Sequence, residues 1–409
     1  MDLPKHGTDW PALKAQMEER SSHDVKWRDG KTAVYVFNAG PDVAKVQKEA
    51  YAMFMSENGL GPLAFPSLKQ MEDEVIGMGL SLLHGPADAA GNITSGGTDS
   101  ITMAIKAARD FARAERGHTG QGNIVAPYSA HPAFDKAAMM MDLQVRRVPC
   151  RELLADPAAM EDVIDDKTLM LVGSAPCFPY GLMDPIEALG EVAARKQVWL
   201  HVDACVGGYL APFVRMNGSD IAPFDFEIPA VQSMSADLHK YGYCAKGAST
   251  VLFRSEALRA YMMFHCSDWP GGKMTTPTLA GTRPGGAIAA AWAVMNFLGE
   301  AGYRAKQKQV TDTRERIEAG AKALGFEILG RPQLGLMAFG HPEVDPIAVW
   351  AKLYERGWFT GVTTEPRGLH LMLSPFHAEV ADVYLADLEW ALNEARAGSA
   401  KSQAAPRYS

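Results

Sequence analysis

Residues 198–208 read Val-Trp-Leu-His-Val-Asp-Ala-Cys-Val-Gly-Gly, and this stretch decides the fold class of the chain. Its first residues form a short apolar, β-prone run without regular polar alternation, which is typical of a strand buried on both faces. Strands of this kind belong to parallel sheets, whose ligands bind beyond the carboxyl ends of the strands. The stretch therefore predicts a strand at 198–202, with Asp203 at its ligand-binding end.

Similar runs occur on both sides of this strand and alternate with helical patterns from about Ile93 to Phe253. Strands that alternate with helices predict an α/β fold, in which helices cover both faces of a mostly parallel sheet. The predicted strands are 123–126, 144–148, 169–172, 198–202, 232–235 and 250–253, and the predicted helices between them include 98–115, 131–141 and 185–196.

The regions that flank this sheet predict smaller units. Residues 1–60 are polar and form an N-terminal arm or dimerisation segment, and 61–303 form the large domain, which ends in a long helix at about 284–302. A small C-terminal α+β domain is expected at 304–396, with helices near 312–324 and 378–396 and strands near 336–339 and 369–373. The remaining residues, 397–409, are expected to be disordered.

Composition excludes several classes of protein. The chain has 409 residues, of which 47% are hydrophobic and 22% charged, as in ordinary globular proteins. Its net charge of -8 does not favour binding to nucleic acid. Its longest apolar run, 286–298, is shorter than the roughly 20 residues that span a bilayer. The cysteines form no CxxC pair and the N-terminus has no apolar signal core, so we expect a cytoplasmic protein without a disulfide framework or a zinc site.

A glycine-rich segment, Thr94-Ser95-Gly96-Gly97-Thr98, precedes the helical pattern at 98–115. Glycines allow a ligand to approach the backbone closely, and the free N–H groups of a helix N-terminus suit a phosphate. The segment is neither a Walker A loop nor a dinucleotide fingerprint. The alternative is an ordinary turn in which Thr98 is the helix N-cap.

Two polar residues follow predicted strands further along the chain. Asp203 either holds a protonated ring nitrogen or a metal ion, or caps a turn. Lys240 follows the strand at 232–235, and a lysine in a partly desolvated site has a lowered pKa and can form a Schiff base. The alternative is a solvated surface lysine, which the neighbours Met234, Leu238, Tyr241 and Tyr243 argue against.

His131, which follows the strand at 123–126, either begins a helix or stacks on a flat ring. Together, the glycine-rich loop, this histidine, Asp203 and Lys240 match the chemistry of pyridoxal 5′-phosphate (PLP). This cofactor carries a phosphate, a ring nitrogen that pairs with an aspartate, and an aldehyde that binds a lysine. A nicotinamide dehydrogenase would not need the lysine at a strand end.

Several long motifs, in the same order, resemble the group II decarboxylase superfamily of PLP enzymes and, within it, the family of sphingosine-1-phosphate lyases. The resemblance runs from about Tyr35 to beyond Gly302, and its main motifs are TSGGTDS (94–100), IVAPYSAHPAFDKAA (124–138), HVDACVGG (201–208), SADLHKYGYCAKG (235–247) and LAGTRPGG (279–286). It implies the fold-type-I PLP-dependent transferase fold, PLP as the cofactor, and a homodimer with shared active sites.

The resemblance also implies roles for individual residues. Lys240 would hold the cofactor covalently, Asp203 would pair with its ring nitrogen, and His131 would stack on its ring. The other cofactor-binding residues would be Ser95, Gly96, Gly97, Thr98, His239 and, reaching across from the other subunit, Thr282. The expected substrate residues are Tyr35, which would be contributed to the substrate site of the neighbouring subunit, Lys246 and Lys273.

The substrate side of the chain departs from that family. Gly61 stands where the family has a histidine associated with the substrate phosphate, and Met274 replaces a tyrosine. Lys273 is new, and it either supplies a replacement positive charge or is a solvated lysine at the rim. The cofactor residues are intact, so the departures concern the substrate.

The function that the resemblance implies is carbon–carbon cleavage of a β-hydroxy amine, expected to be phosphorylated, in sphingolipid metabolism. The products would be an aldehyde and an amine such as phosphoethanolamine. An amino-acid decarboxylase on the same fold is the alternative, and a non-catalytic scaffold that has kept the motifs is a third possibility. The expected partners are a small amine substrate and a second copy of the chain, with no nucleic acid and no integral membrane segment.

Overall fold

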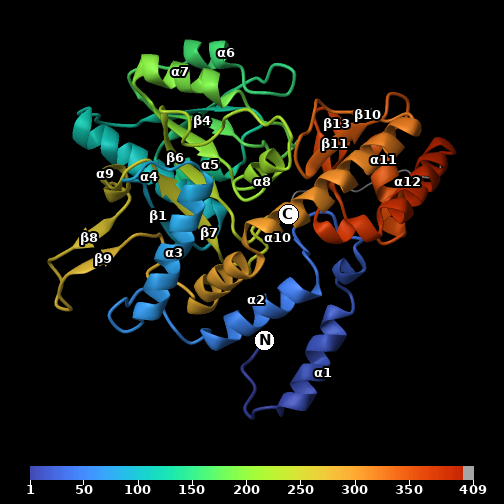
Figure 1. The fold of residues 1–409 in the computed structure, drawn as a ribbon, viewed down its shortest axis with the longest axis horizontal. Coiled ribbons are helices and arrows are strands. Elements are labelled where there is room, and N and C mark those ends of the chain that lie inside the picture. Colours follow the sequence, from blue (N-terminus) through green and yellow to red (C-terminus); the bar gives the residue numbers. More distant parts are fainter. Residues whose placement is uncertain (399–409) are drawn as a thin grey trace.

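The central sheet consists of seven short strands in a computed structural model of the chain, which describes residues 1–398 (Figure 1). The strand order is β1-β7-β6-β5-β4-β2-β3, and every strand except β7 runs in the same direction. The strands are β1 (Ala90–Thr94), β2 (Asn123–Pro127), β3 (Gln144–Val148), β4 (Thr168–Ser174), β5 (Trp199–Asp203), β6 (Val231–Ala236) and β7 (Ser249–Phe253). The predicted mostly parallel sheet is therefore confirmed.

Both faces of this sheet are covered, as the unbroken apolar runs predict. Val125 of β2 and Leu171 of β4 belong to one hydrophobic core, whereas their neighbours Ile124 and Val172 belong to a second core on the opposite face. The helices of this unit are α4 (Gly97–Glu115), α5 (Ala133–Met140), α6 (Pro157–Asp162), α7 (Ile186–Lys196), α8 (Ala211–Met216) and α9 (Glu256–Ala260).

The N-terminal residues form helices that lie against the sheet unit only in part. They are α1 (Trp10–Ser21), the short 3₁₀ helix η1 (Trp27–Asp29), α2 (Pro41–Met53) and α3 (Pro66–Leu82). Helix α1 has no buried residue and projects from the body of the molecule, whereas α2 packs along α10 (Figure 1). Proline occupies the first position of α2 and α3, where its missing N–H would have no helical partner.

A long helix, α10 (Gly285–Ala323), joins the sheet unit to a smaller α+β unit (Figure 1). The sequence predicts two helices here, at 284–302 and 312–324. The chain is helical between these ranges, and α10 is instead interrupted by a kink at Gly299, whose φ of 55° suits glycine. The small sheet is antiparallel, with the order β10-β11-β13-β12. Its elements are β10 (Glu327–Ile328), β11 (Leu336–Gly340), α11 (Pro346–Glu355), β12 (Gly361–Thr364), β13 (Arg367–Met372), η2 (Pro375–Glu379) and α12 (Ala381–Arg396).

Several elements were not predicted by the sequence analysis, among them β10, α11 and β12 of the small unit, and two further features are notable. Strand β1 is an unpredicted member of the central sheet, because its Ala-Gly-Asn start has little β-propensity and pairing with β7 holds it in place. A projecting hairpin, β8 (Phe264–Cys266) and β9 (Met274–Thr276), was also not predicted (Figure 1). The predicted domain boundaries remain predictions, and the predicted tail, 397–409, lies outside the described residues from 399 onward.

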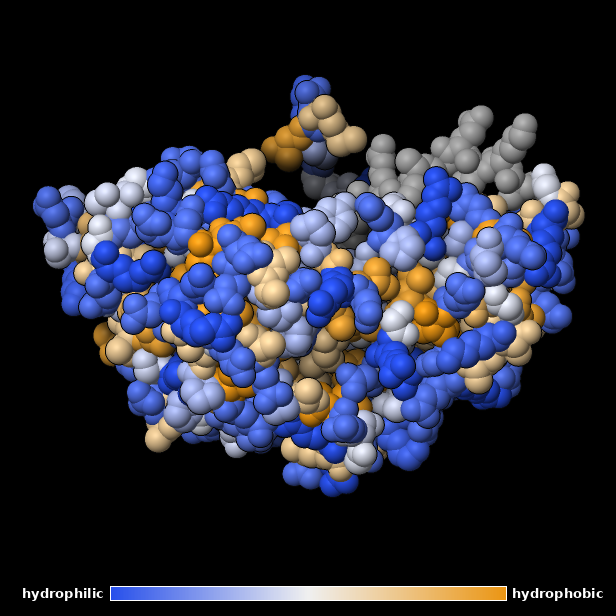
Figure 2. Space-filling model, turned by 90° about the horizontal axis from the view of Figure 1, so that it is seen from above, coloured by the Kyte–Doolittle hydropathy of each residue, from blue (hydrophilic) through white to orange (hydrophobic). Residues whose placement is uncertain are grey.

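Surface hydropathy and helix composition indicate whether the described residues could contact a membrane. Figure 2 shows one face of the molecule, on which hydrophobic residues form small patches among hydrophilic ones. Within residues 1–398, no helix combines the length and the apolar character needed to cross a bilayer.

Candidate active site

The predicted site residues converge at the carboxyl edge of the central sheet. The ends of β1, β5 and β6 and the loop after β2 surround a cavity of about 370 Å³, which we call the charged cavity. Its wall contains Ser95, Gly96, Gly97, Thr98, Asp99, Ile101, His131, Pro176, Phe178, Asp203, Cys205, Val206, Asp237, His239 and Lys240. Parallel strands bring these residues together because all their carboxyl ends meet at one edge.

Lys240 is the cationic group of this cavity. Its Nζ lies 3.0 Å from Oδ2 of Asp237, and only 21% of its side chain is exposed, so the surface-lysine alternative is wrong. The expected lowered pKa is wrong as well. Burial alone would lower the pKa of Lys240, but the negative charge of Asp237 raises it above the ordinary lysine value.

Asp237 is the functional residue that sequence reasoning missed. Burial opposes its ionisation, but the charges of Lys240 and His239 lower its pKa below the ordinary value, so it is a carboxylate. Its position directly after β6, three residues before Lys240, was the available signal. A carboxylate at the end of a strand forms an ion pair with a lysine this close in the sequence when both side chains are buried.

Asp203 occupies the end of β5 and is buried. Its Oδ1 accepts hydrogen bonds from the Cys205 backbone N–H at 3.1 Å and from Ser235 Oγ at 3.2 Å. The first of these is the turn-capping interaction offered as an alternative, and the same carboxylate still lines the cavity. Two bonds of this kind fix its orientation, as a ligand-pairing carboxylate requires.

His131 lies across the cavity, and its Nδ1 accepts a hydrogen bond from the Ala133 backbone N–H at 3.1 Å. It therefore begins the α5 segment and also lines the cavity, and its stacking on a flat ring stays a prediction. Burial lowers the pKa of His131, against the opposing charge of Asp203. The ring is thus the neutral, flat surface on this side of the cavity.

The glycine-rich loop leads into α4 at the cavity. The helix begins at Gly97 with Gly96 as N-cap, so Thr98 lies in the first turn and is not the N-cap. A Cβ on Gly97 would lie 2.7 Å from Cys205 Sγ and 2.9 Å from Asp237 Oδ2, so this position requires glycine. Ser95 donates from its backbone N–H and its Oγ to Asp99 Oδ2, both at 3.0 Å, which ties the loop to the helix.

The remaining predicted residues lie outside the charged cavity. Lys246 is exposed at the surface and donates to the His239 carbonyl oxygen at 3.3 Å, and desolvation by the surrounding protein together with the charge of Lys240 lowers its pKa to about 8. Thr282 is exposed, and its Oγ1 accepts a hydrogen bond from Asn58 Nδ2 at 3.3 Å. Lys273 is exposed in the turn of the β8–β9 hairpin. The structure therefore does not bring Thr282 or Lys273 to the cavity of their own chain.

A second, larger cavity of about 820 Å³ adjoins the first, and we call it the apolar cavity. It shares His131 and Phe178 with the charged cavity and lies between the loops after β2 and β4 and the strands of the small unit. The predicted substrate residue Tyr35 is in its wall. The other lining residues include Val34, Tyr128, Tyr180, Trp350, Phe359, Thr360, Val362, Glu365 and His370.

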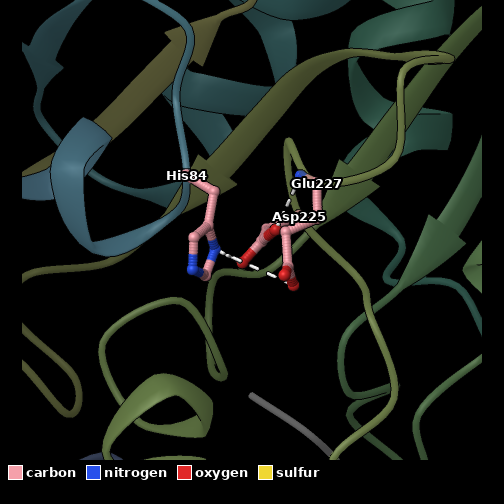
Figure 3. A group of neighbouring side chains, drawn as sticks. All are labelled: His84, Asp225 and Glu227. Carbon is pink, nitrogen blue, oxygen red and sulfur yellow. Dashed lines mark hydrogen bonds and ion pairs between the residues drawn. The ribbon is translucent and has the colours of Figure 1, made fainter.

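A cluster elsewhere resembles a metal site in its residue types. His84, Asp225 and Glu227 lie together at the end of α3 and in the loop before β6, at the sheet edge away from the charged cavity (Figure 3). His84 Nδ1 is 3.0 Å from Asp225 Oδ2, and Arg215 donates to Glu227 at 2.6 Å. Asp225 and Glu227 already have partners in His84 and Arg215, so the cluster is explained as a network of hydrogen bonds and ion pairs.

Comparison with known proteins identifies relatives that cover most of the chain. The sphingosine-1-phosphate lyase of Oryza sativa subsp. japonica is 39% identical over 405 residues, which cover 96% of this chain and 75% of the relative. A probable L-tyrosine/L-aspartate decarboxylase of Methanocella arvoryzae is 34% identical, over 92% of this chain and 96% of the relative.

A solved structure extends this likeness to the fold. The sphingosine-1-phosphate lyase of Burkholderia pseudomallei superposes with a TM-score of 0.93 at 36% identity, covering 98% of this chain and 94% of that chain. The family model of the pyridoxal-dependent decarboxylase conserved domain matches residues 1–341. The chain therefore belongs to the pyridoxal-dependent decarboxylase family, as a lyase similar to the sphingosine-1-phosphate lyases.

Proposed function

We propose that this chain is a PLP-dependent lyase that breaks the Cα–Cβ bond of a phosphorylated β-hydroxy amine. It would release an aldehyde and an amine such as phosphoethanolamine. The observation that carries this proposal is the arrangement of Lys240, Asp203 and the N-terminus of α4 around one cavity. These groups suit an aldehyde, a protonated ring nitrogen and a phosphate, respectively.

The wall of the charged cavity fits PLP in a further respect. One buried polar atom of this wall, Asp99 Oδ1, has no hydrogen-bond partner among the described residues. Buried polar atoms are nearly always paired, so unpaired ones around a cavity indicate a polar ligand or ordered water. Ser95 supports the loop through Asp99, whereas Gly96, Gly97 and Thr98 present the start of α4 to the phosphate.

The residues of the chain divide the work of the reaction. When bound, PLP supplies an aldehyde for the substrate amine and a ring that accepts the electron pair of the broken bond. Asp203 holds a proton on the ring nitrogen, and Asp237 orients Lys240 through their hydrogen bond. Lys246, with a pKa of about 8, is partly neutral near that pH and is suited to accept the proton of the substrate hydroxyl.

We also propose that the chain acts as a cytoplasmic homodimer. Thr282 and Lys273 lie on exposed segments away from their own charged cavity, as expected of residues that serve the site of a second copy. The same region exposes the apolar side chains of Trp269 and Leu279, which a second copy would bury. Sedimentation of the purified chain should give twice the monomer mass, and a monomer would contradict this part of the proposal.

The function is tested with the full chain loaded with PLP. We expect a yellow protein that borohydride bleaches, with the reduced label on Lys240, and release of aldehyde from sphingosine-1-phosphate. The exposed Lys308→Ala change in α10 is the control that should keep colour and label. Release of carbon dioxide from tyrosine or aspartate without aldehyde release would favour the decarboxylase alternative, and a protein that stays colourless would favour the scaffold.

A further inference from the structure

Two neighbouring strands of the central sheet carry polar groups at every second position on one face. Trp199, His201 and Asp203 alternate along β5, and Ser233 and Ser235 alternate along β6. The parallel register pairs His201 with Ser233 and Asp203 with Ser235. Side chains two residues apart point to the same face of a strand, so these groups form one row that ends at the charged cavity.

Hydrogen bonds connect these side chains into a single series, which we call the buried network. Trp199 Nε1 donates to Ser233 Oγ at 2.8 Å, and Ser233 Oγ lies 2.8 Å from His201 Nδ1. On the other side of the imidazole, His201 Nε2 lies 3.3 Å from Ser235 Oγ, which donates to Asp203 Oδ1 at 3.2 Å. The four residues that precede Asp203 in this series are at most 2% exposed, so the network is closed to bulk water.

The chemistry of the two ends fixes the direction of every hydrogen bond in the buried network. The Trp199 indole can only donate, and a carboxylate can only accept. Burial lowers the pKa of His201 to about 4, against the opposing charge of Asp203, so the ring is neutral near pH 7 and carries one N–H. The hydroxyl hydrogen of Ser235 points to Asp203. His201 therefore donates to Ser235 from Nε2, and its Nδ1 accepts from Ser233.

The opposite tautomer would leave hydrogen bonds unmade. With the hydrogen on Nδ1, His201 would accept from Ser235 at Nε2, and the oxygens of Ser235 and Asp203 would face each other at 3.2 Å without a hydrogen between them. Ser233 Oγ would accept two hydrogen bonds and find no acceptor for its own hydrogen among the described residues. Unmade hydrogen bonds between buried groups are costly, so the geometry favours the tautomer with hydrogen on Nε2.

The buried network delivers its last donor to Asp203 Oδ1. The Cys205 backbone N–H donates to the same oxygen at 3.1 Å, so Oδ2 is the oxygen left for the ring nitrogen of PLP. A donor at Oδ1 stabilises the negative charge of the carboxylate, which keeps the shared proton on the ring nitrogen. Each donor is polarised by the donor behind it, so we expect the effect to decline from Ser235 to Trp199.

We propose that the four residues of the buried network behind Asp203 are positioning residues, which keep the ring nitrogen of PLP protonated through that carboxylate. None of the four is in the wall of the charged cavity, so they act on the cofactor only through Asp203. This inference rests on the proposed function, because it requires PLP in the charged cavity.

Nitrogen-15 NMR of the full PLP-loaded chain, labelled at its histidine rings, tests the direction of the buried network. His201→Phe identifies the two signals of His201 by their loss. We expect a protonated Nε2 and an unprotonated Nδ1 near pH 7. A proton on Nδ1, or protons on both nitrogens, would overturn the inference.

The ring nitrogen of isotope-labelled PLP gives a second readout that does not depend on His201→Phe, because its chemical shift reports whether it carries a proton. Ser235→Ala removes the donor to Asp203, so the signal should move toward the unprotonated position and PLP should bind about 10-fold more weakly. Ser233→Ala and Trp199→Phe should act in the same direction, with a loss of about 2–3-fold in PLP binding. An unchanged signal in Ser235→Ala, or equal effects along the network, would contradict the proposal.

Thr250→Val is the matched control, because it removes a buried hydroxyl of the same sheet that lies outside the buried network. Thr250 Oγ1 donates to the Ala236 carbonyl oxygen at 2.9 Å. The variant should lower stability without moving the ring-nitrogen signal, and a shift equal to that of Ser235→Ala would overturn the inference. A colourless wild type would contradict the proposed function and the inference with it, whereas a yellow wild type with any of the contrary signals would contradict the inference alone.

Discussion

The charged cavity and the apolar cavity share two wall residues and differ in how they are built. The charged cavity lies at the strand ends of one sheet, and its wall carries Lys240, Asp237 and Asp203 within a single folding unit. The apolar cavity lies between two units, and its wall holds mainly aromatic and aliphatic side chains. Charged side chains in fixed positions suit a small charged cofactor. A large apolar surface suits a flexible apolar ligand.

The largest expected effect comes from Asp203→Ala in the charged cavity. Without this carboxylate the ring nitrogen of PLP would lose its proton and its capacity to accept electrons, so turnover should fall by about 100-fold or more. Steady-state kinetics of the PLP-loaded variant measure the loss. Near-normal turnover would show that Asp203 is not needed to keep the ring nitrogen of PLP protonated.

Asp237→Asn should change the acidity of the charged cavity. The variant removes the negative charge that raises the pKa of Lys240, while the burial that lowers it remains. Because PLP reacts with the neutral amine, the midpoint of the pH profile for PLP uptake should fall by about 1–3 pH units. Asp237→Glu keeps the negative charge, so its midpoint should stay close to that of the wild type. An unchanged midpoint in Asp237→Asn would rule out the ion pair.

Gly97→Ala tests the fit of the loop that starts α4. The new Cβ would clash with Cys205 Sγ and Asp237 Oδ2, so PLP should bind about 10-fold more weakly in a fluorescence titration. Gly77→Ala is the matched control, because no atom lies within 4 Å of its Cβ position on the exposed face of helix α3. It should leave binding unchanged and stabilise the chain by about 0.5–1 kcal/mol. Equal affinities of the two variants would contradict the tight fit.

The smallest effect concerns pH and stability. The pKa of His370 in the apolar cavity and of His201 beneath the charged cavity is about 4 in the folded chain, against about 6.5 when unfolded. The unfolded chain therefore binds more protons between these values, and stability should fall as pH drops from about 6.5 to about 4. His370→Leu should make this fall shallower in urea unfolding, whereas Tyr384→Phe should not. An unchanged slope in His370→Leu would mean that this histidine is not buried in the neutral form.

The charged cavity was predictable to an unusual extent because its residues stand at strand ends. Asp203 and Lys240 each follow a run of buried-strand character, and the parallel sheet brings such ends together whatever the loops do. The role of Asp237 and the raised pKa of Lys240 were not predictable, because both depend on a distance of 3.0 Å between two side chains. Burial alone, which the sequence suggested, has the opposite effect on a lysine pKa.

The sequence by itself determined the parallel sheet, the residues at its ligand-binding edge and the family, because strand periodicity and contiguous motifs are local properties of the chain. Only the tertiary structure decided that α10 continues through 303–311, that β1 joins the sheet, and that the Phe178 ring meets the His370 ring beside the apolar cavity. These features depend on packing between segments far apart in the chain. The hydrophobic pattern of each unit predicts the residues of its own core. It does not predict a cavity that forms between two units.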